Sequence, residues 1–320
     1  MSNSDRIQQQ LPYVLRETHF DFLGDRYEGK VRDSYRGRKC RYLVTSDRLS
    51  CFDRVVAYVP FKGQVLTELA VHWFRQTDHI VRNHLIESPD PNVMAVRDCT
   101  MLPVEVVVRA YLTGSAWRDY DAGKPISGVV LPEGLTKHGK LPEVIVTPST
   151  KAATGSHDMP ISESEIVGQN LVAKNIWEEA RAKALALFDY GQKRAAERGL
   201  ILVDTKYEFG MHEGGLILAD EIHTLDSSRY WVNESYHERV RRGQEPIMLD
   251  KEPTRQWLLD QGYQGDGPIP HFSDEHLALI SEHYIQAFEW ITGEKFVPFE
   301  GDPLPRIAGN LREFEEAFGA

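Results

Sequence analysis

The sequence predicts a globular fold that combines antiparallel strands with helices. Residues 201–210 and 216–222 are dense in β-branched, aromatic and aliphatic side chains, and the glycines between them suit a hairpin turn. Residues 25–45 have the pattern of short strands joined by turns. Beyond residue 250 the apolar residues recur at helical spacing, chiefly over 274–292.

Length and composition restrict the class of protein. The 320 residues are enough for two domains or for one large domain with additions, and 41% hydrophobic and 27% charged residues are ordinary for a globular chain. The net charge of -11 argues against broad binding to nucleic acid or anionic membranes, because those surfaces attract a dominant positive field. We therefore expect small-molecule substrates as partners, and no nucleic acid and no membrane.

Cysteine and histidine usage indicates the compartment and the metal chemistry. Cys40, Cys51 and Cys99 form no CxxC pair, and their odd number leaves at least one free thiol, which suits a reducing cytosol. The first residues lack the apolar core of a signal peptide, so we expect a cytoplasmic protein. The twelve histidines show neither an HExxH pair nor zinc-finger spacing, so we predict no transition-metal site.

The first strands contain a lysine directly after a glycine turn, at Gly29 and Lys30. Such a turn can lay backbone amides and an ammonium group over a phosphate. A lysine beside a turn glycine is more often simply solvated. The pattern alone leaves both interpretations open.

The next predicted elements are a strand over 42–45, a polar loop over 46–53 and a helix over 65–77. The helix is predicted because apolar residues recur at helical spacing over 65–77. A second apolar strand covers 101–112 and contains Arg109 near its end. A buried arginine is costly unless an anion or a carboxylate meets it. Arg109 is therefore either part of a structural ion pair or part of an anion site.

The segment 119–160 is rich in Gly, Pro, Thr and Lys, and a long segment of this kind is more often functional or mobile than idle. Ser162 and Glu165 then form a predicted capping box, and one helical stretch follows up to Gly199. The last helix, over 274–292, should end at Gly293. We expect this C-terminal part to supply packing rather than chemistry.

The hairpin carries the strongest signal for a site. Because side chains alternate along a strand, Asp204, Lys206 and Glu208 must share one face. A turn centred near Glu213 would place Lys206 opposite Asp220, with the register uncertain by about one residue. A solvated sheet face is the alternative. Continuous apolar runs in both strands favour a covered sheet instead, in which charges need partners, and so favour a functional cleft.

Seven motifs, taken together, resemble the family of phosphoribosylaminoimidazole-succinocarboxamide synthases, the SAICAR synthetases of the purine pathway, in their longer single-function form. The resemblance runs from about Tyr27 to Trp231. The motifs stand in the family's order at residues 29–33, 45–50, 62–67, 108–117, 147–152, 203–210 and 219–223.

The resemblance implies a two-lobed α+β fold with an antiparallel nucleotide-binding lobe similar to those of protein kinases and ATP-grasp enzymes. We expect this lobe over 1–105, and an α/β lobe for substrate and metal over 106–320, with C-terminal helices from about 250. The implied activity is that of an ATP-dependent ligase. ATP activates the carboxylate of carboxyaminoimidazole ribotide, most simply as an acyl phosphate, and the amine of L-aspartate displaces phosphate. A monomer is compatible with the sequence.

The resemblance also implies roles for residues. Lys30 would contact the ATP phosphates, and the strand that ends at Glu105 would present backbone groups to adenine. Glu208 and Asp220 would hold Mg²⁺, whose preferred ligands are hard oxygens. Lys206 would neutralise charge on the reacting group.

For the other substrates, the resemblance implies that Arg109, Ser115 and Arg229 receive the ribotide phosphate. Lys151 and Asp158 match a substrate-facing loop. Asp204 is left with two roles, either as a magnesium ligand or as the group that orients Lys206.

Two other classes of protein remain open at this point. A small-molecule or lipid-headgroup kinase would use ATP on the same residues, with a hydroxyl acceptor and no amine. A non-catalytic nucleotide-binding protein would share the fold, but the intact set of Lys206, Glu208 and Asp220 argues against it.

Overall fold

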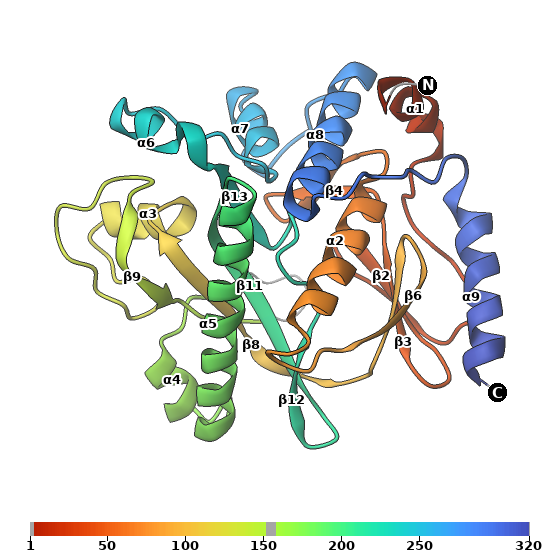
Figure 1. Cartoon of the computed structure of the whole chain (residues 1–320), viewed down its shortest axis with the longest axis horizontal. Helices are drawn as coiled ribbons and strands as arrows, with labels where there is room; N and C mark the ends of the chain where they lie inside the picture. The colour runs from red at the N-terminus through yellow and green to blue at the C-terminus, as the bar shows by residue number, and fades with distance from the viewer. Residues whose placement is uncertain (1–2, 152–157, 320) are drawn as a thin grey trace. The chain divides into compact units, whose positions relative to one another are not determined.

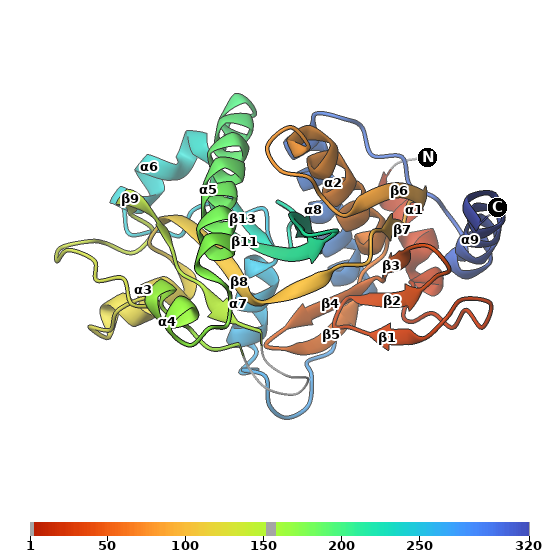
Figure 2. The same cartoon turned by 90° about the horizontal axis from the view of Figure 1, so that it is seen from below.

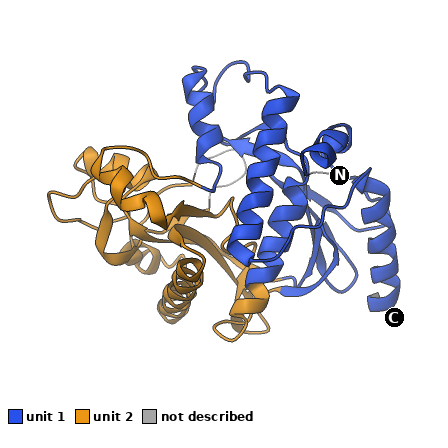
Figure 3. Cartoon of the chain, turned by 45° about the horizontal axis from the view of Figure 1, so that its top comes forward, with its two compact units in different colours: residues 1–73, 85–98, 249–320 blue, residues 74–84, 99–248 orange. Residues whose placement is uncertain are grey.

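The computed structural model describes residues 3–151 and 158–319. The chain forms two compact units (Figure 3). The first unit consists of Met1–Trp73, Leu85–Asp98 and Leu249–Ala320, and the second of Phe74–His84 and Cys99–Met248. Within the described residues, no helix has the length and apolar character that crossing a membrane requires.

These units divide the chain differently from the expected lobes, 1–105 and 106–320. Residues 249–320 belong to the first unit, because the last helix places Ile307 and Leu311 in the same apolar cluster as Tyr42 and Val44. Residues 100–105 belong to the second unit, because they are the first half of one continuous strand.

The first unit contains a five-stranded antiparallel sheet and a separate two-stranded hairpin (Figures 1 and 2). The short strands predicted over 25–45 are confirmed as three neighbours of that sheet. In sheet order its strands are β1 (Arg26–Glu28), β2 (Arg32–Arg36), β3 (Arg41–Thr45), β7 (Val93–Val96) and β6 (Leu85–Asp90). The hairpin consists of β4 (Arg48–Cys51) and β5 (Arg54–Tyr58).

Helices complete the first unit. The helix predicted over 274–292 is confirmed: the Ser273 side chain accepts a hydrogen bond from the N–H of His276, and Gly293 ends the helix with φ 75°. The helices are α1 (Asn3–Gln10), η1 (Leu11–Tyr13), α2 (Lys62–Thr77), α7 (Glu252–Asp260), α8 (Asp274–Thr292) and α9 (Pro303–Gly319). The end of α2, from Phe74, is counted with the second unit.

The second unit is a six-stranded antiparallel sheet with helices. Its central strands run in the order β10, β8, β11 and β12, while β9 pairs with β8 and β13 pairs with β11. The strands are β8 (Thr100–Tyr111), β9 (Lys140–Val146), β10 (Ser149–Thr150), β11 (Leu200–His212), β12 (Gly215–Ala219) and β13 (Ser228–Val232). The helices are α3 (Gly114–Asp121), α4 (Glu163–Gly168), α5 (Lys174–Glu197) and α6 (Asn233–Arg241).

The helical stretch after Ser162 is two helices rather than the single one predicted. The capping box is confirmed, since Ser162 and Glu165 each accept a hydrogen bond from the other's main-chain N–H. The chain breaks between α4 and α5, where Asn170 takes the left-handed conformation with φ 55°. α5 then packs against β11 and ends just before Gly199.

The hairpin of β11 and β12 has a two-residue turn, Glu213 and Gly214, and both residues have positive φ. A two-residue turn pairs His212 with Gly215 and therefore Glu208 with Ala219. The predicted pairing, which assumed a turn centred on Glu213, is wrong by one residue. Asp220 follows the end of β12 with φ 64° rather than pairing with Lys206.

Gly191 of α5 allows the helix to approach the sheet closely. A Cβ atom at this position would lie 2.4 Å from Cε1 of His223 and 2.8 Å from Cδ2 of Leu202. We therefore expect Gly191→Ala to lower the free energy of unfolding by about 1–2 kcal/mol, because overpacking outweighs the better helix propensity of alanine. Urea titration followed by circular dichroism measures this change.

Gly168→Ala is the matched control, because a Cβ there meets no atom within 4 Å. It should change the free energy of unfolding by less than about 1 kcal/mol. Equal stability of the two variants would contradict the close packing of α5.

Candidate active site

Three adjacent antiparallel strands bring charged residues together in the second unit. The register places Asp204 of β11 opposite Arg109 of β8 and opposite Arg229 of β13. It also places Glu208 of β11 directly opposite Glu105 of β8. Each strand is largely buried, so these charges must be satisfied by one another.

The first group is a lysine cluster made of Glu105, Lys151, Lys206 and Glu208. Nζ of Lys206 lies 2.7 Å from Oε1 of Glu105 and 2.5 Å from Oε1 of Glu208. Lys151 forms an ion pair with the other carboxylate oxygen of Glu208. Two glutamates directly opposite each other repel. Lys206 of β11 therefore offsets the repulsion between Glu208 of β11 and Glu105 of β8.

Burial and charge act in opposite directions on the lysine cluster. Burial lowers the pKa of Lys206, but Glu208, Glu105 and Asp220 together outweigh it and raise that pKa well above its ordinary value. Burial raises the pKa of Glu208, but Lys206 and Lys151 outweigh it and hold that pKa far below its usual range. For Glu105 burial prevails, so its pKa is raised although Lys206 opposes the shift. Lys206 is thus a permanent cation at neutral pH.

The second group is an arginine cluster made of Arg109, Asp204 and Arg229. Oδ2 of Asp204 accepts hydrogen bonds from Nη1 of Arg109 at 3.0 Å and from Nη1 of Arg229 at 2.6 Å. Nε of Arg109 donates to Oγ1 of Thr147 at 2.9 Å, and its Nη2 lies 3.4 Å from Oγ of Ser115. Two guanidinium groups share the carboxylate of Asp204, and Asp119 adds a further negative charge to the surroundings of Arg109.

The N-terminus of α3 lies beside Arg229. Gly114, the first residue of α3, has φ 58°, and a Cβ there would lie 2.5 Å from Nη2 of Arg229. The N-cap residue Thr113 directs its hydroxyl to Nδ1 of His138 instead of capping the helix. Main-chain N–H groups at a helix start and a guanidinium both favour anions. This corner of the second unit is suited to a phosphate or carboxylate group.

The remaining predicted site residues lie in two places. Asp158 is exposed, and its charge contributes to the raised pKa of Glu105. Residues 152–157, which include Ala152 of the motif over 147–152, lie outside the described residues. Lys30 belongs to the first unit, where its exposed side chain forms an ion pair with Asp53 in the turn between β4 and β5.

Local sequence patterns did not predict that Glu105 belongs to the lysine cluster, nor that Thr147 and Gly114 lie beside the arginines. The signal for Glu105 was a glutamate among the apolar residues at the start of the strand Met101–Leu112, because such a carboxylate needs a cationic partner. The contacts of Thr147 and Gly114 depend on which strands are neighbours. That information is absent from local patterns.

Glu208 and Asp220 suit a magnesium ion that is bound by only one or two protein carboxylates. Within residues 3–151 and 158–319, no three histidine, cysteine, aspartate or glutamate side chains form a metal-binding group. Mg²⁺ commonly takes one or two protein carboxylates and completes its coordination with water and substrate phosphates. Glu208 and Asp220 both raise the pKa of Lys206, and their hard oxygens are of the kind that this mode requires.

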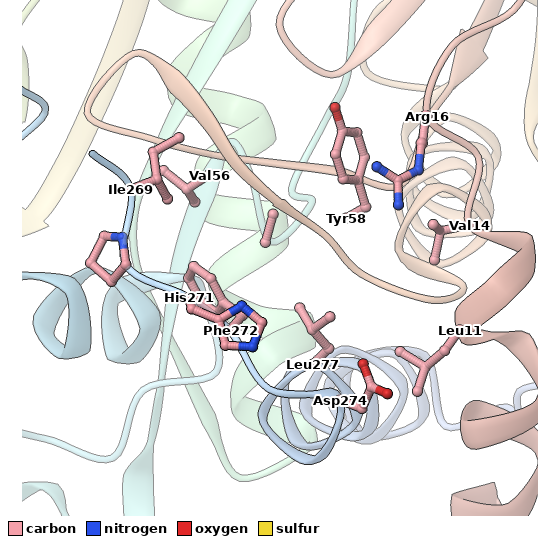
Figure 4. Close-up of a pocket in the computed structure, with 12 residues that line it drawn as sticks. Leu11, Val14, Arg16, Val56, Tyr58, Ile269, His271, Phe272, Asp274 and Leu277 are labelled. Atoms are coloured by element: carbon pink, nitrogen blue, oxygen red, sulfur yellow. The ribbon is translucent and has the colours of Figure 1, made fainter. Parts of the chain in front are cut away.

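A pocket of about 390 Å³ lies in the first unit (Figure 4). Most of its lining is apolar, and the guanidinium of Arg16 lies 4.3 Å from the centre of the Tyr58 ring. No predicted site residue lines it. The pocket therefore does not carry the chemistry of the lysine and arginine clusters.

The fold is an antiparallel α+β fold, and its second unit contains a protonated lysine and a pair of arginines whose chemistry suits anionic groups. The sequence model of the SAICAR synthetase family matches residues 25–270. The chain belongs to this family, since the match covers well over half of its 320 residues.

Individual relatives agree with the family match. The chain is 45% identical to the phosphoribosylaminoimidazole-succinocarboxamide synthase of Legionella pneumophila (strain Lens), over 95% of this chain and 99% of the relative. It is 46% identical to the enzyme of that name from Bacteroides thetaiotaomicron, over 94% and 98% of the two chains.

Solved structures show the same fold. The SAICAR synthase from Saccharomyces cerevisiae complexed with SAICAR has a TM-score of 0.78 and 30% identity, over 88% of this chain and 99% of that one. A type-2 SAICAR synthetase in complex with ADP has a TM-score of 0.66 and 26% identity, over 85% and 100%.

Removal of the Lys206 charge should make stability depend on pH in a new way. In the wild type the pKa of Glu208 lies below its unfolded value, so its stabilising contribution is present at neutral pH and is lost as pH falls. Glu105 has a raised pKa in the wild type, and Lys206→Met removes the cation that opposes this shift, so the pKa of Glu105 rises further. The free energy of unfolding of the variant therefore falls more steeply than that of the wild type as pH rises through the ordinary carboxyl pKa. The difference from wild type should reach about 2 kcal/mol at neutral pH, discounted because the Lys206 side chain is 30% exposed.

Urea titrations between about pH 4 and pH 7 measure the difference. Lys193→Met is the matched control, since Lys193 is exposed on α5 and pairs with Asp189. A difference between Lys206→Met and wild type that stays constant with pH would contradict the charge balance described for the lysine cluster.

Proposed function

We propose that the lysine and arginine clusters catalyse the reaction of this family: ATP-dependent ligation of L-aspartate to the carboxylate of carboxyaminoimidazole ribotide. The products are SAICAR, ADP and phosphate, in purine biosynthesis. Family membership over nearly the whole chain supports the reaction. The observation that carries the assignment of the site is the protonated Lys206 held between Glu105 and Glu208.

The reaction needs an activated carboxylate. A carboxylate oxygen of the ribotide attacks the γ-phosphorus of ATP, the bond to the bridging oxygen of ADP breaks, and an acyl phosphate forms. The aspartate amine then attacks the acyl carbon, the bond to phosphate breaks, and the amine loses a proton. Lys206 would act by electrostatic stabilisation of the transferring phosphoryl group, because its raised pKa keeps it protonated.

The arginine cluster would bind the ribotide phosphate. Arg109 and Arg229 supply guanidinium donors, Ser115 supplies a hydroxyl, and the start of α3 supplies main-chain N–H groups. The contacts of Asp204 support a role different from the two expected ones. Its carboxylate would orient both arginines toward the phosphate rather than bind Mg²⁺ or orient Lys206.

Lys30 would contact the ATP phosphates. The main chain of the strand up to Glu105 would contact adenine, while the Glu105 side chain holds Lys206. Lys151, which pairs with Glu208, and Asp158 would face the substrates.

Glu208 and Asp220 would hold Mg²⁺, which supplies charge neutralisation on the phosphates when bound. Glu208, Glu105 and Asp220 all act on Lys206 as negative charges. These carboxylates support the binding of a further cation nearby.

The free thiols of Cys40, Cys51 and Cys99 support a reducing compartment, which we propose to be the cytoplasm. We propose a monomer as the active form.

Release of ADP tests the reaction. With ATP and Mg²⁺ present, release should require carboxyaminoimidazole ribotide and L-aspartate together. Turnover without L-aspartate would indicate a kinase, and the absence of turnover with all substrates would reject the proposed activity.

Loss of one guanidinium from the arginine cluster should weaken ribotide binding selectively. We expect Arg229→Ala to raise KM for the ribotide roughly 100-fold, since removal of one partner from a buried charged contact costs about 2–3 kcal/mol. KM for ATP should stay within about twofold. Steady-state kinetics with each substrate varied in turn measure both constants.

Arg194→Ala is the matched control, because Arg194 lies on the exposed face of α5 and pairs with Glu197. It should leave every constant unchanged. A rise in KM for ATP, with KM for the ribotide unaltered, would show that Arg229 belongs to the nucleotide site instead.

A further inference from the structure

The first unit contains a buried arginine that the proposed reaction does not use. Arg48 is 4% exposed, and its guanidinium contacts four acceptors. Nε donates to the carbonyl of Lys30 at 3.2 Å, and Nη2 donates to the carbonyl of Gly29 at 3.2 Å. Nη1 donates to the carbonyl of Arg16 at 3.0 Å, and Nη2 also donates to Oδ1 of Asp33 at 2.7 Å. Two of its partners thus belong to the glycine turn before β2.

A second residue of the same loop holds the turn from the same side. The carbonyl of Val31 accepts hydrogen bonds from the Ser46 hydroxyl at 2.7 Å and from the Ser46 N–H at 2.9 Å. Three successive carbonyls, those of residues 29–31, therefore point toward the segment that contains Ser46 and Arg48.

The carbonyl directions determine the directions of the N–H groups. In a trans peptide the C=O of one residue and the N–H of the next point opposite ways, and no cis peptide bond occurs in the described part of the chain. The N–H groups of Lys30 and Val31 therefore point away from Arg48. Successive N–H groups arranged in this way form a concave site for anions. The exposed ammonium of Lys30 adds a positive charge on the same turn.

The anchor of Arg48 is itself rigid. Asp33 accepts hydrogen bonds at 2.8 Å from both the N–H and the hydroxyl of Thr18. Burial raises the pKa of Asp33, but the hydrogen bonds from Arg48 and Thr18 outweigh burial and lower it, so the carboxylate is ionised. Gly29 completes the turn, since a Cβ there would lie 2.9 Å from the carbonyl oxygen of Arg32.

We propose that Arg48 is a positioning residue for nucleotide binding. It holds the turn over residues 29–31 with its carbonyls inward, so that the N–H groups of Lys30 and Val31 and the Lys30 ammonium receive phosphate oxygens of ATP. This inference rests on the proposed role of Lys30 at the ATP phosphates. In this proposal the buried Arg48 side chain fixes the direction of the N–H groups in the turn, which the exposed Lys30 side chain alone does not fix.

Arg48→Lys in the full-length protein tests the proposal. Lysine keeps the charge but has one nitrogen, which cannot reach the acceptors on both sides of the guanidinium. We expect the Kd for ADP, measured by titration calorimetry, and KM for ATP to rise about tenfold, because the carbonyls lose charged donors. KM for the ribotide and for L-aspartate should stay within about twofold.

Arg26→Lys is the matched control. Arg26 also contacts Asp33, at 3.3 Å, and is not a donor to the turn carbonyls in the contacts described above. The Arg26→Lys variant should have a lower thermal stability than the wild type, but the same Kd for ADP. Equal weakening in both variants, or unchanged ADP affinity in a folded Arg48→Lys variant, would overturn the positioning role.

Hydrogen exchange of the wild type provides a second measurement that does not depend on whether the variant folds. ADP should slow exchange at the amides of Lys30 and Val31, and unchanged exchange there would overturn the proposal. Lys30→Met distinguishes the proposed ATP contact of Lys30 from the proposed positioning role of Arg48. If Lys30→Met weakens ADP binding and Arg48→Lys does not, only the role of Arg48 fails. If ADP neither protects the turn nor responds to Lys30→Met, the proposed ATP contact of Lys30 fails as well.

Discussion

The second unit depends on one lysine between two opposed glutamates. Glu105 and Glu208 face each other on adjacent strands, and their repulsion would weaken the pairing of β8 with β11 if Lys206 did not lie between them. The same contact keeps Lys206 charged and fixes its position. The group that relieves the repulsion between these two glutamates is therefore also the cation that we propose to stabilise charge in a substrate.

β11 connects the two clusters because it pairs with β8 on one side and β13 on the other. Asp204 faces an arginine on each neighbour, and two positions further along the same strand Lys206 begins the lysine cluster. Antiparallel register therefore sets the distance between the arginine cluster and Lys206. A register shift of one residue would send all of these side chains to the opposite face.

Local sequence patterns predicted the features that depend on neighbouring residues, such as strand faces and helix ends. Alternation along 203–209 predicted the shared face of Lys206 and Glu208, and the cap signals at Ser162 and Gly293 predicted helix ends. The pairing of Asp220 was wrong because it depended on whether the turn has one or two central residues. The partners of Asp204 and the placement of 249–320 required knowledge of which distant segments meet, and no periodicity contains that information.

The discontinuous first unit constrains how the chain can fold during synthesis. Ile307 and Leu311 of α9 belong to the same core as Tyr42 and Val44, so that core stays incomplete until the last helix has left the ribosome. The second unit, formed by residues 74–84 and 99–248, has all of its strands available earlier. Domains fold as units during translation. The lysine and arginine clusters can therefore assemble before α9 is available to pack against the sheet that contains β1, β2 and β3.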